Sequence, residues 1–167
     1  MALPIRGLVE LARPSSISIR PARSRESIEV ARLLYTSLMN GVDGVLPINR
    51  QKLFDHVYLT INSTDGFVQV AEEGGRIVGV FAAELQPHAY CDGYVASELG
   101  VYIDPEHRGG RTFVTLLEDY LAWVGIKPNV LLSGFTISQL GPTTPYLRRV
   151  LERHGFTRGS EGYYRYE

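Results

Sequence analysis

The chain has 167 residues, 44% of them hydrophobic, and its 17 basic and 18 acidic side chains leave a formal net charge of -1. A chain of this length buries enough apolar surface to fold as one domain without disulfides or metals. The balanced charge argues against a nucleic-acid partner, because such proteins usually carry a basic excess or stripe. The single cysteine, Cys91, excludes an internal disulfide, and no His/Cys spacing is typical of a metal site. We therefore expect a reducing, cytoplasmic setting.

No stretch of the chain predicts a membrane span or a signal peptide. The longest apolar runs, such as Ile77–Ala83, fall far short of the roughly 20 residues that a spanning helix needs, so no membrane partner is expected. Pro4 and Arg6 interrupt the region where a signal peptide keeps an apolar run. We interpret residues 1–15 as an N-terminal arm and residues 16–167 as a single domain.

The first part of this domain predicts one strand and two helices. Residues 16–20 alternate apolar and polar side chains, which is typical of a half-buried strand. Apolar residues then recur at helical spacing from Ser24, a suitable N-cap, to Asn40-Gly41, which can supply a left-handed stop. A second helix follows Pro47 and ends at the polar residues 62–64.

A β-hairpin is the clearest local prediction. Strand-like runs at 67–72 and 76–85 flank Gly74-Gly75, a pair that can adopt the positive φ angles of a tight turn. The second run is apolar on both faces at Ile77–Ala83, so we expect it at the centre of the sheet.

Strands and helices alternate in the second half of the chain. The spacing predicts, in order, a strand at 95–103, a helix at 113–124, a strand at 130–137, a helix opened by Thr144-Pro145 and closed by Gly155, and a final strand pair at Phe156 and 163–166. This order predicts an α/β fold, a mixed sheet with helices on both faces.

Residues 99–112 run from a strand through a glycine turn into a helix. Unpaired N–H groups and the dipole at a helix N-terminus attract an anion such as phosphate. Gly109 and Gly110 permit close approach to the backbone, and Arg108 and Arg111 can add charged contacts. The alternative is an ordinary strand-to-helix turn.

The run 101–110, Val-x-Ile-x-Pro-x-x-Arg-Gly-Gly, together with the element order and the later Gly155-Phe156 pair, resembles the GNAT superfamily of acyl-CoA-dependent N-acyltransferases. The resemblance covers the chain from Ile17 onward. It implies a mostly antiparallel central sheet of roughly six to seven strands with about four helices on both faces. It also implies that the strand before the turn splays from its neighbour and that the acyl-CoA lies in the gap.

The turn matches the family pattern in part. That pattern is Arg or Gln, two residues, Gly, one residue, then Gly or Ala. Arg108 matches its first position, and Gly109 and Gly110 fill the variable ones, whereas Arg111 and Phe113 replace the two later small residues. The Arg-Gly-Gly-Arg sequence is similar to that of some bacteriophage-borne members, which implies a bacteriophage-type subfamily.

The resemblance implies acetyl-CoA as cosubstrate and assigns residues to it. Val101, Tyr102 and Ile103 would contact the pantetheine arm and acyl carbonyl, where a backbone N–H can stabilise the oxyanion. The residues implied to hold the phosphates are Arg108, Gly109, Gly110, Arg111 and Thr112.

The acceptor amine must lose a proton, since a lysine has a reference pKa of about 10.4. Glu98 is the candidate base, because several family members place a catalytic Glu near this point of the strand. A register slip of one residue would turn it to the opposite face, and the alternative is an edge carboxylate in water. The general-acid Tyr of many members corresponds here to Leu151, so Tyr146 is the candidate substitute, with a packed tyrosine at the helix start as its alternative.

Two further tyrosines and a nearby loop are weaker candidates. Tyr102 and Tyr90 rank below Tyr146 as acids. His88 and Cys91 lie three residues apart in a loop, but no surrounding motif activates the thiol, so we reject a nucleophilic role.

These features predict an N-acetyltransferase that moves acetyl from acetyl-CoA to a primary amine by direct attack. The acceptor is a protein lysine or N-terminus, a polyamine or another small amine, and the protein is a monomer or homodimer. Residues 40–106 hold three basic and ten acidic side chains, which would favour a cationic amine if they surround the acceptor cleft. A solvated face is the simpler explanation. The alternative function is a catalytically inactive binding or structural module with the GNAT fold, which Arg111, Phe113 and Leu151 favour.

Overall fold

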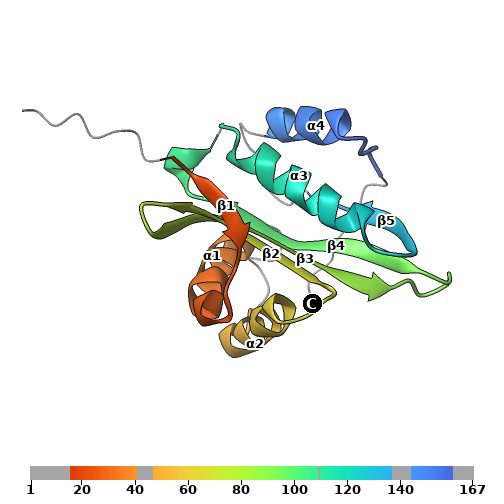
Figure 1. The fold of residues 1–167 in the computed structure, drawn as a ribbon, viewed down its shortest axis with the longest axis horizontal. Helices are drawn as coiled ribbons and strands as arrows, with labels where there is room; N and C mark the ends of the chain where they lie inside the picture. The colour runs from red at the N-terminus through yellow and green to blue at the C-terminus, as the bar shows by residue number, and fades with distance from the viewer. Residues whose placement is uncertain (1–15, 41–46, 109, 137–143, 160–167) are drawn as a thin grey trace, which may run out of the picture.

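The computed structural model describes residues 16–40, 47–108, 110–136 and 144–159 (Figure 1). Within these residues, five strands form one sheet in the order β1-β2-β3-β4-β5. Neighbouring strands are antiparallel except for the parallel pair of β4 and β5. The strands are β1 (Ser18–Pro21), β2 (Gly66–Glu73), β3 (Arg76–Pro87), β4 (Tyr94–Ile103) and β5 (Val130–Gly134).

Helices cover both faces of this sheet. They are α1 (Ser27–Met39), α2 (Arg50–Ile61), α3 (Thr112–Gly125) and α4 (Thr144–Arg153), with short 3-10 turns η1 (Ser24–Glu26) and η3 (Pro105–His107). Helices α1 and α2 lie on one face, and α3 and α4 lie on the other (Figure 1). The predicted α/β fold, with a mostly antiparallel sheet and helices on both faces, is confirmed.

Each face has its own apolar core. On the α1–α2 face, Val30 and Leu34 of α1 pack with Val57 of α2 against Val70 and Val80 of the central strands. The other core is larger and aromatic, with these buried members from α3 and the sheet: Leu116, Leu117, Tyr120, Phe81 and Ala96. Burial of this kind contributes roughly 25 cal/mol per Å² of apolar surface and is what holds the helices on the sheet.

The hairpin forms as predicted. Gly74 and Gly75 have φ angles of 57° and 84°, and β2 and β3 pair on either side of them. Every residue of Ile77–Ala83 is buried, and this run lies in β3 at the middle of the sheet.

The predicted six to seven strands become five in the described residues. Phe156 lies in no strand but packs against the α3-side core. Residues 163–166, where the other half of the predicted pair falls, lie outside the described residues, as does the N-terminal arm 1–15. Strand β5 ends at Gly134 rather than at Ile137, which is itself outside the described residues.

The start of the first helix differs from the prediction. Ser24 is the first residue of η1 instead of the N-cap of a helix, and Arg23 occupies the N-cap position of η1. Glu26 stands at the N-cap position of α1 without a side-chain capping bond to that helix. Its carboxylate accepts from the Arg23 N–H at 2.8 Å and from Arg20 at 2.8 and 2.9 Å. Asn40 ends α1 in a right-handed conformation with φ -91°, and Gly41 lies outside the described residues.

Candidate active site

Strand β4 separates from β5 partway along its length. The parallel pairing runs from Tyr94 opposite Val130 to Ser97 opposite Gly134. Within the described residues, β4 continues from Glu98 to Ile103 without β5 beside it. We call the side of β4 away from β3 after Ser97, where no described strand pairs with it, the opening.

A bulge in β4 lies at the mouth of this opening. Gly100 pairs with Ala82 and Glu98 with Ala83, which leaves Leu99 as the extra residue. Val101 packs against the α3-side core, as Ala96 does before the bulge. Alternation from Ala96 also places Glu98 on the α3 side. Residues three apart in a regular strand face opposite sides, so the bulge is what puts Glu98 and Val101 on one face.

The backbone of β4 presents alternate residues to the opening. The Asp104 N–H donates to the Val78 carbonyl at 2.8 Å, so this residue faces β3. Because hydrogen-bonded and non-hydrogen-bonded pairs alternate in an antiparallel ladder, Tyr102 also faces β3, whereas Val101 and Ile103 direct their N–H and C=O groups to the opening. The sequence predicts that the backbone of all three residues 101–103 contacts the acyl-pantetheine arm. In the structure only Val101 and Ile103 direct backbone groups to the opening, since the backbone of Tyr102 is turned toward β3.

Both carbonyls at this edge accept hydrogen bonds from side chains. The Ser37 hydroxyl of α1 donates to the Val101 carbonyl at 2.7 Å. At the other end, Arg108 Nε donates to the Ile103 carbonyl at 2.8 Å. Sequence analysis missed Ser37, and nothing in its local pattern indicates a contact with a strand 64 residues away.

Glu98 lies where β4 and β5 diverge. Its Oε2 accepts from the Thr136 N–H at 3.3 Å, which connects it to the segment that follows β5. The neighbouring Tyr120 hydroxyl donates to the Ala96 carbonyl at 3.0 Å. Burial, and secondarily the charge of Glu98, raise the pKa of Tyr120, so this phenol stays protonated beside the carboxylate.

The turn after β4 ends in the N-terminus of α3. Arg111 occupies the N-cap position without a side-chain capping bond, and the first turn of α3 contains no acidic residue. The first N–H groups of a helix have no partner within it, so here they can bind an anion. Gly110 is exposed and has open space where a Cβ would stand, whereas Gly109 lies outside the described residues. Thr112 begins α3 and is buried.

Two ion pairs join this turn to the β2–β3 hairpin. His107 Nε2 lies 2.9 Å from Glu73 Oε2, and Arg76 lies 3.2 Å from Asp104. A hollow of about 780 Å³ flanks the turn on its β1 side and reaches Ile17 and Ile19. The turn is thus held from the hairpin while one flank stays open.

Tyr146 lies at the turn and not beside Glu98. Its hydroxyl donates to the Gly110 carbonyl at 3.4 Å. Glu98 is five residues before the end of β4, which corresponds to about 17 Å of strand. Leu151 and Phe113 are 7% and 6% exposed and both belong to the α3-side core, which accommodates these two departures from the family pattern.

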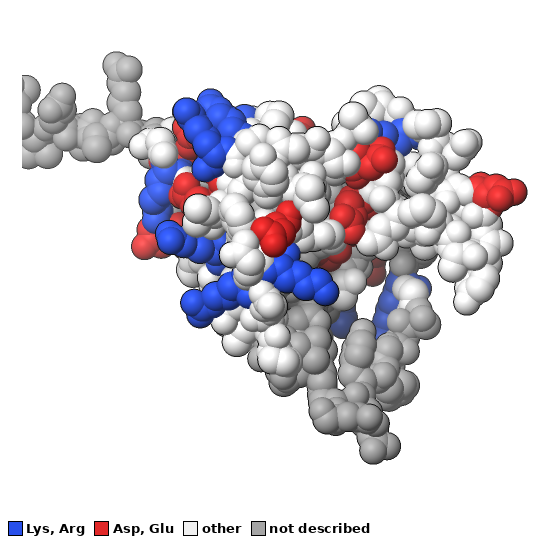
Figure 2. Space-filling model, turned by 90° about the horizontal axis from the view of Figure 1, so that it is seen from below, with Lys and Arg blue, Asp and Glu red and all other residues white. Residues whose placement is uncertain are grey.

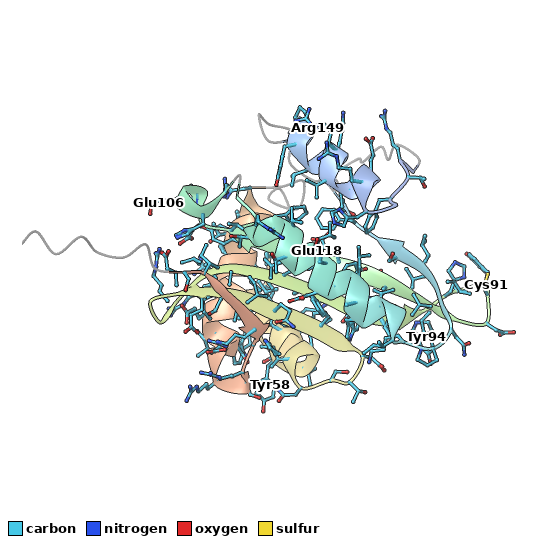
Figure 3. All side chains as sticks on the ribbon, turned by 45° about the horizontal axis from the view of Figure 1, so that its top comes forward. Tyr58, Cys91, Tyr94, Glu106, Glu118 and Arg149 are labelled. Carbon is cyan, nitrogen blue, oxygen red and sulfur yellow. The ribbon has the colours of Figure 1, made fainter. Side chains whose placement is uncertain are left out.

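The loop that contains Cys91 is remote from the turn. Figure 3 shows Cys91 at the tip between β3 and β4, at the opposite end of the molecule from Glu106, which precedes the turn. Cys91 is exposed, and the Tyr90 N–H donates to His88 Nδ1 at 3.1 Å. The described residues contain no cluster of three or more His, Cys, Asp or Glu that could hold a metal.

Several acidic residues of the middle segment form ion pairs with basic residues. The pairs are Glu72 with Arg20, Glu73 with His107, Glu84 with His56, and Asp104 with Arg76, and the second and fourth of them lie at the turn. Figure 2 looks at the α1–α2 side and shows acidic side chains interspersed with basic ones. The preference for a cationic amine, expected from the charge of residues 40–106, stays a prediction. None of the helices in the described ranges is long and apolar enough to cross a membrane.

The fold has many counterparts among solved structures. A predicted acetyltransferase from Clostridium acetobutylicum, solved with acetyl-CoA, has a TM-score of 0.72 at 16% identity, over 90% of this chain and 96% of that one. A GCN5-related N-acetyltransferase from Ralstonia eutropha JMP134 has a TM-score of 0.70 at 16% identity, over 90% and 99%. The aminoglycoside N-acetyltransferase AAC(6')-Iy in complex with CoA has a TM-score of 0.67 at 14% identity, over 94% and 98%.

At these identities the likeness shows the fold. The sequence has no match among curated proteins. Residues 36–130, more than half of the chain, match the model of the acetyltransferase (GNAT) family. The matched range includes β4, its bulge and the turn into α3. The chain therefore belongs to the acetyltransferase (GNAT) family.

Proposed function

We propose that the chain transfers an acetyl group from acetyl-CoA to a primary amine. The observation that carries this proposal is the path of β4, whose Val101 and Ile103 face an opening and which then leads into a glycine-containing turn at the N-terminus of α3. The amide carbonyls of an extended pantetheine arm can accept from N–H groups at the edge of a strand, and a pyrophosphate suits a helix N-terminus. Family membership and the CoA complexes of structural neighbours support acyl-CoA as the cosubstrate.

The phosphates bind at the turn and the thioester at the bulge. Arg108, Gly109, Gly110, Arg111 and Thr112 surround the pyrophosphate through backbone N–H groups and two guanidinium groups. Val101 and Ile103 donate their N–H groups along the acyl-pantetheine arm, with Tyr102 between them packed on the α1 side. The Val101 N–H is the donor nearer to Glu98, and we assign it to the oxyanion of the tetrahedral intermediate.

Glu98 acts as the general base. The neutral amine attacks the thioester carbonyl carbon, a C–N bond forms and the C–S bond breaks, so that CoA leaves as its thiolate and is then protonated. The proton that the amine loses goes to Glu98, directly or through water. Glu98 shares the face of Val101 because of the bulge, whereas Tyr146 lies at the turn, so the proposal gives Tyr146 no role as an acid at the thioester.

The identity of the acceptor amine and the cellular compartment are further parts of the proposal. The acceptor is a protein lysine or N-terminus, a polyamine or another small amine. The aminoglycoside acceptor named for one structural neighbour belongs to that protein, and it adds a small cationic amine to the compounds worth assaying. A cytoplasmic setting, a bacteriophage-type subfamily and a monomer or homodimer stay predictions from the sequence.

A calorimetric titration with acetyl-CoA tests the first step. We expect saturable binding, followed by acetylation in a screen of amines and lysine-bearing proteins read by a mass shift of one acetyl group. Absence of binding at millimolar acetyl-CoA would favour the alternative, a non-catalytic module with the GNAT fold. The observation on which that alternative rests is Arg111 at a position where the family usually has glycine.

A further inference from the structure

The open edge of β4 differs from the edge of an ordinary strand. An unpaired strand edge offers N–H donors and C=O acceptors in alternation. Here the Val101 carbonyl already accepts from the Ser37 hydroxyl at 2.7 Å, and the Ile103 carbonyl accepts from Arg108 Nε at 2.8 Å. The edge therefore presents the N–H groups of Val101 and Ile103 to a ligand, while the carbonyl groups of both residues are already hydrogen-bonded.

Close packing of α1 against the bulge brings Ser37 to this edge. A Cβ at Gly100 would lie 3.0 Å from Leu34 Cδ2, so the glycine lets α1 approach β4. Ser37 lies three residues after Leu34 on the same side of the helix. Its hydroxyl, half-buried, thus reaches the carbonyl of the residue whose N–H we assign to the oxyanion.

We propose that Ser37 is a positioning residue for the thioester carbonyl. The inference rests on the proposed function. A thioester oxygen held by the Val101 N–H lies close to the carbonyl oxygen of Val101 itself, and two acceptor oxygens side by side repel each other. The hydrogen bond from Ser37 reduces the negative charge on the Val101 carbonyl oxygen and fixes the orientation of the Val101 backbone. Both effects favour binding of the acyl carbonyl at the Val101 N–H. Free CoA has no such carbonyl, so its binding does not depend on Ser37.

The difference between the two ligands supplies the test. Acetyl-CoA and CoA are titrated by calorimetry into the wild type and Ser37→Ala. We expect the Kd of acetyl-CoA to rise about fivefold to tenfold, the effect of one hydrogen bond, while the Kd of CoA changes less than about twofold. Ser37→Thr retains the hydroxyl and should restore the preference.

Thr36→Ala is the matched control. Thr36 precedes Ser37 in α1, is exposed, and donates to the Arg32 carbonyl of its own helix at 3.0 Å. Its loss should change neither Kd. Thermal unfolding of each variant checks the fold, and Ser37→Cys, which keeps the volume with a weaker donor, replaces Ser37→Ala if the latter does not fold.

Three results would overturn the inference. An equal loss of affinity for both ligands would show that Ser37 only supports the fold of the edge. Unchanged affinity for both in Ser37→Ala would show that the hydroxyl is dispensable. If the wild type binds neither ligand, the proposed function itself fails and the inference falls with it, a result distinct from the other two.

Discussion

His107 Nε2 lies 2.9 Å from Glu73 Oε2, so the turn before α3 is attached to the end of β2. The two residues are 34 positions apart in the chain. If the turn holds the phosphates of CoA, loss of this ion pair makes the turn more mobile in the free protein. Binding then requires the turn to lose conformational entropy, which weakens the affinity for CoA.

Glu73→Gln should therefore weaken acetyl-CoA binding severalfold in a calorimetric titration. Glu84→Gln is the control, because Glu84 forms a similar pair with His56 at 3.2 Å, away from the turn. Both variants should lose little stability, as partly exposed pairs contribute at most about 1 kcal/mol. Equal affinities in the two variants would contradict a role of the hairpin in holding the turn.

Glu98→Gln should slow acetyl transfer by about 100-fold or more while leaving the Kd of acetyl-CoA nearly unchanged. The amide keeps the size of the carboxylate but cannot take the proton of the amine. Turnover is measured with an acceptor found in the amine screen. Glu118→Gln removes an exposed carboxylate from α3 and serves as the control. Normal turnover in Glu98→Gln would remove Glu98 from the mechanism.

Arg108→Ala should raise the Kd of acetyl-CoA about tenfold, because it removes a charged donor from the phosphates and a hydrogen bond from the Ile103 carbonyl. Its effect should shrink at high salt, as expected for a phosphate contact. Arg25→Ala, at an exposed position in η1, controls for the loss of one positive charge. An unaltered Kd in Arg108→Ala would refute the assigned phosphate contact.

The ion-pair network at the start of α1 predicts a pH dependence of stability. Hydrogen bonds from Arg20 hold the pKa of the Glu26 carboxyl below its usual value. A depressed folded-state pKa stabilises the protein fully above the unfolded-state pKa and loses this contribution as the pH falls through the folded-state value. Arg20→Met should therefore reduce the free energy of unfolding by about 1–2 kcal/mol at neutral pH, and by less near pH 2, in urea titrations.

Arg23→Met separates this effect from a general loss of charge. Arg23 is 54% exposed and its Nη1 lies 3.8 Å from Glu26, so its replacement should change stability little. A destabilisation by Arg20→Met that is the same at both pH values would mean that packing of the Arg20 side chain, and not its bond to Glu26, is what matters.

Local patterns in the sequence were sufficient for the hairpin and for the central strand. Gly74-Gly75 and the apolar run of β3 act through neighbouring residues alone, and both predictions are confirmed. The glycine turn into α3 was visible for the same reason. These features need no information about distant parts of the chain.

The geometry of the opening could not be predicted in this way. Periodicity does not reveal that Leu99 is an extra residue, and this bulge decides which face Glu98 takes. The bond from Ser37 to Val101 joins segments that only the packing of α1 on β4 brings together. Tyr146 was selected by its place in the sequence, whereas the direction of α4 sets its hydroxyl at Gly110.

The engaged carbonyls of β4 also bear on solubility. A strand edge left open inside a sheet is a template on which another chain can add a strand and start aggregation. Such addition needs carbonyl acceptors as well as N–H donors, and on this edge Ser37 and Arg108 already occupy the acceptors of Val101 and Ile103. The same two side chains thus make this edge of β4 a poorer template for a strand of another chain.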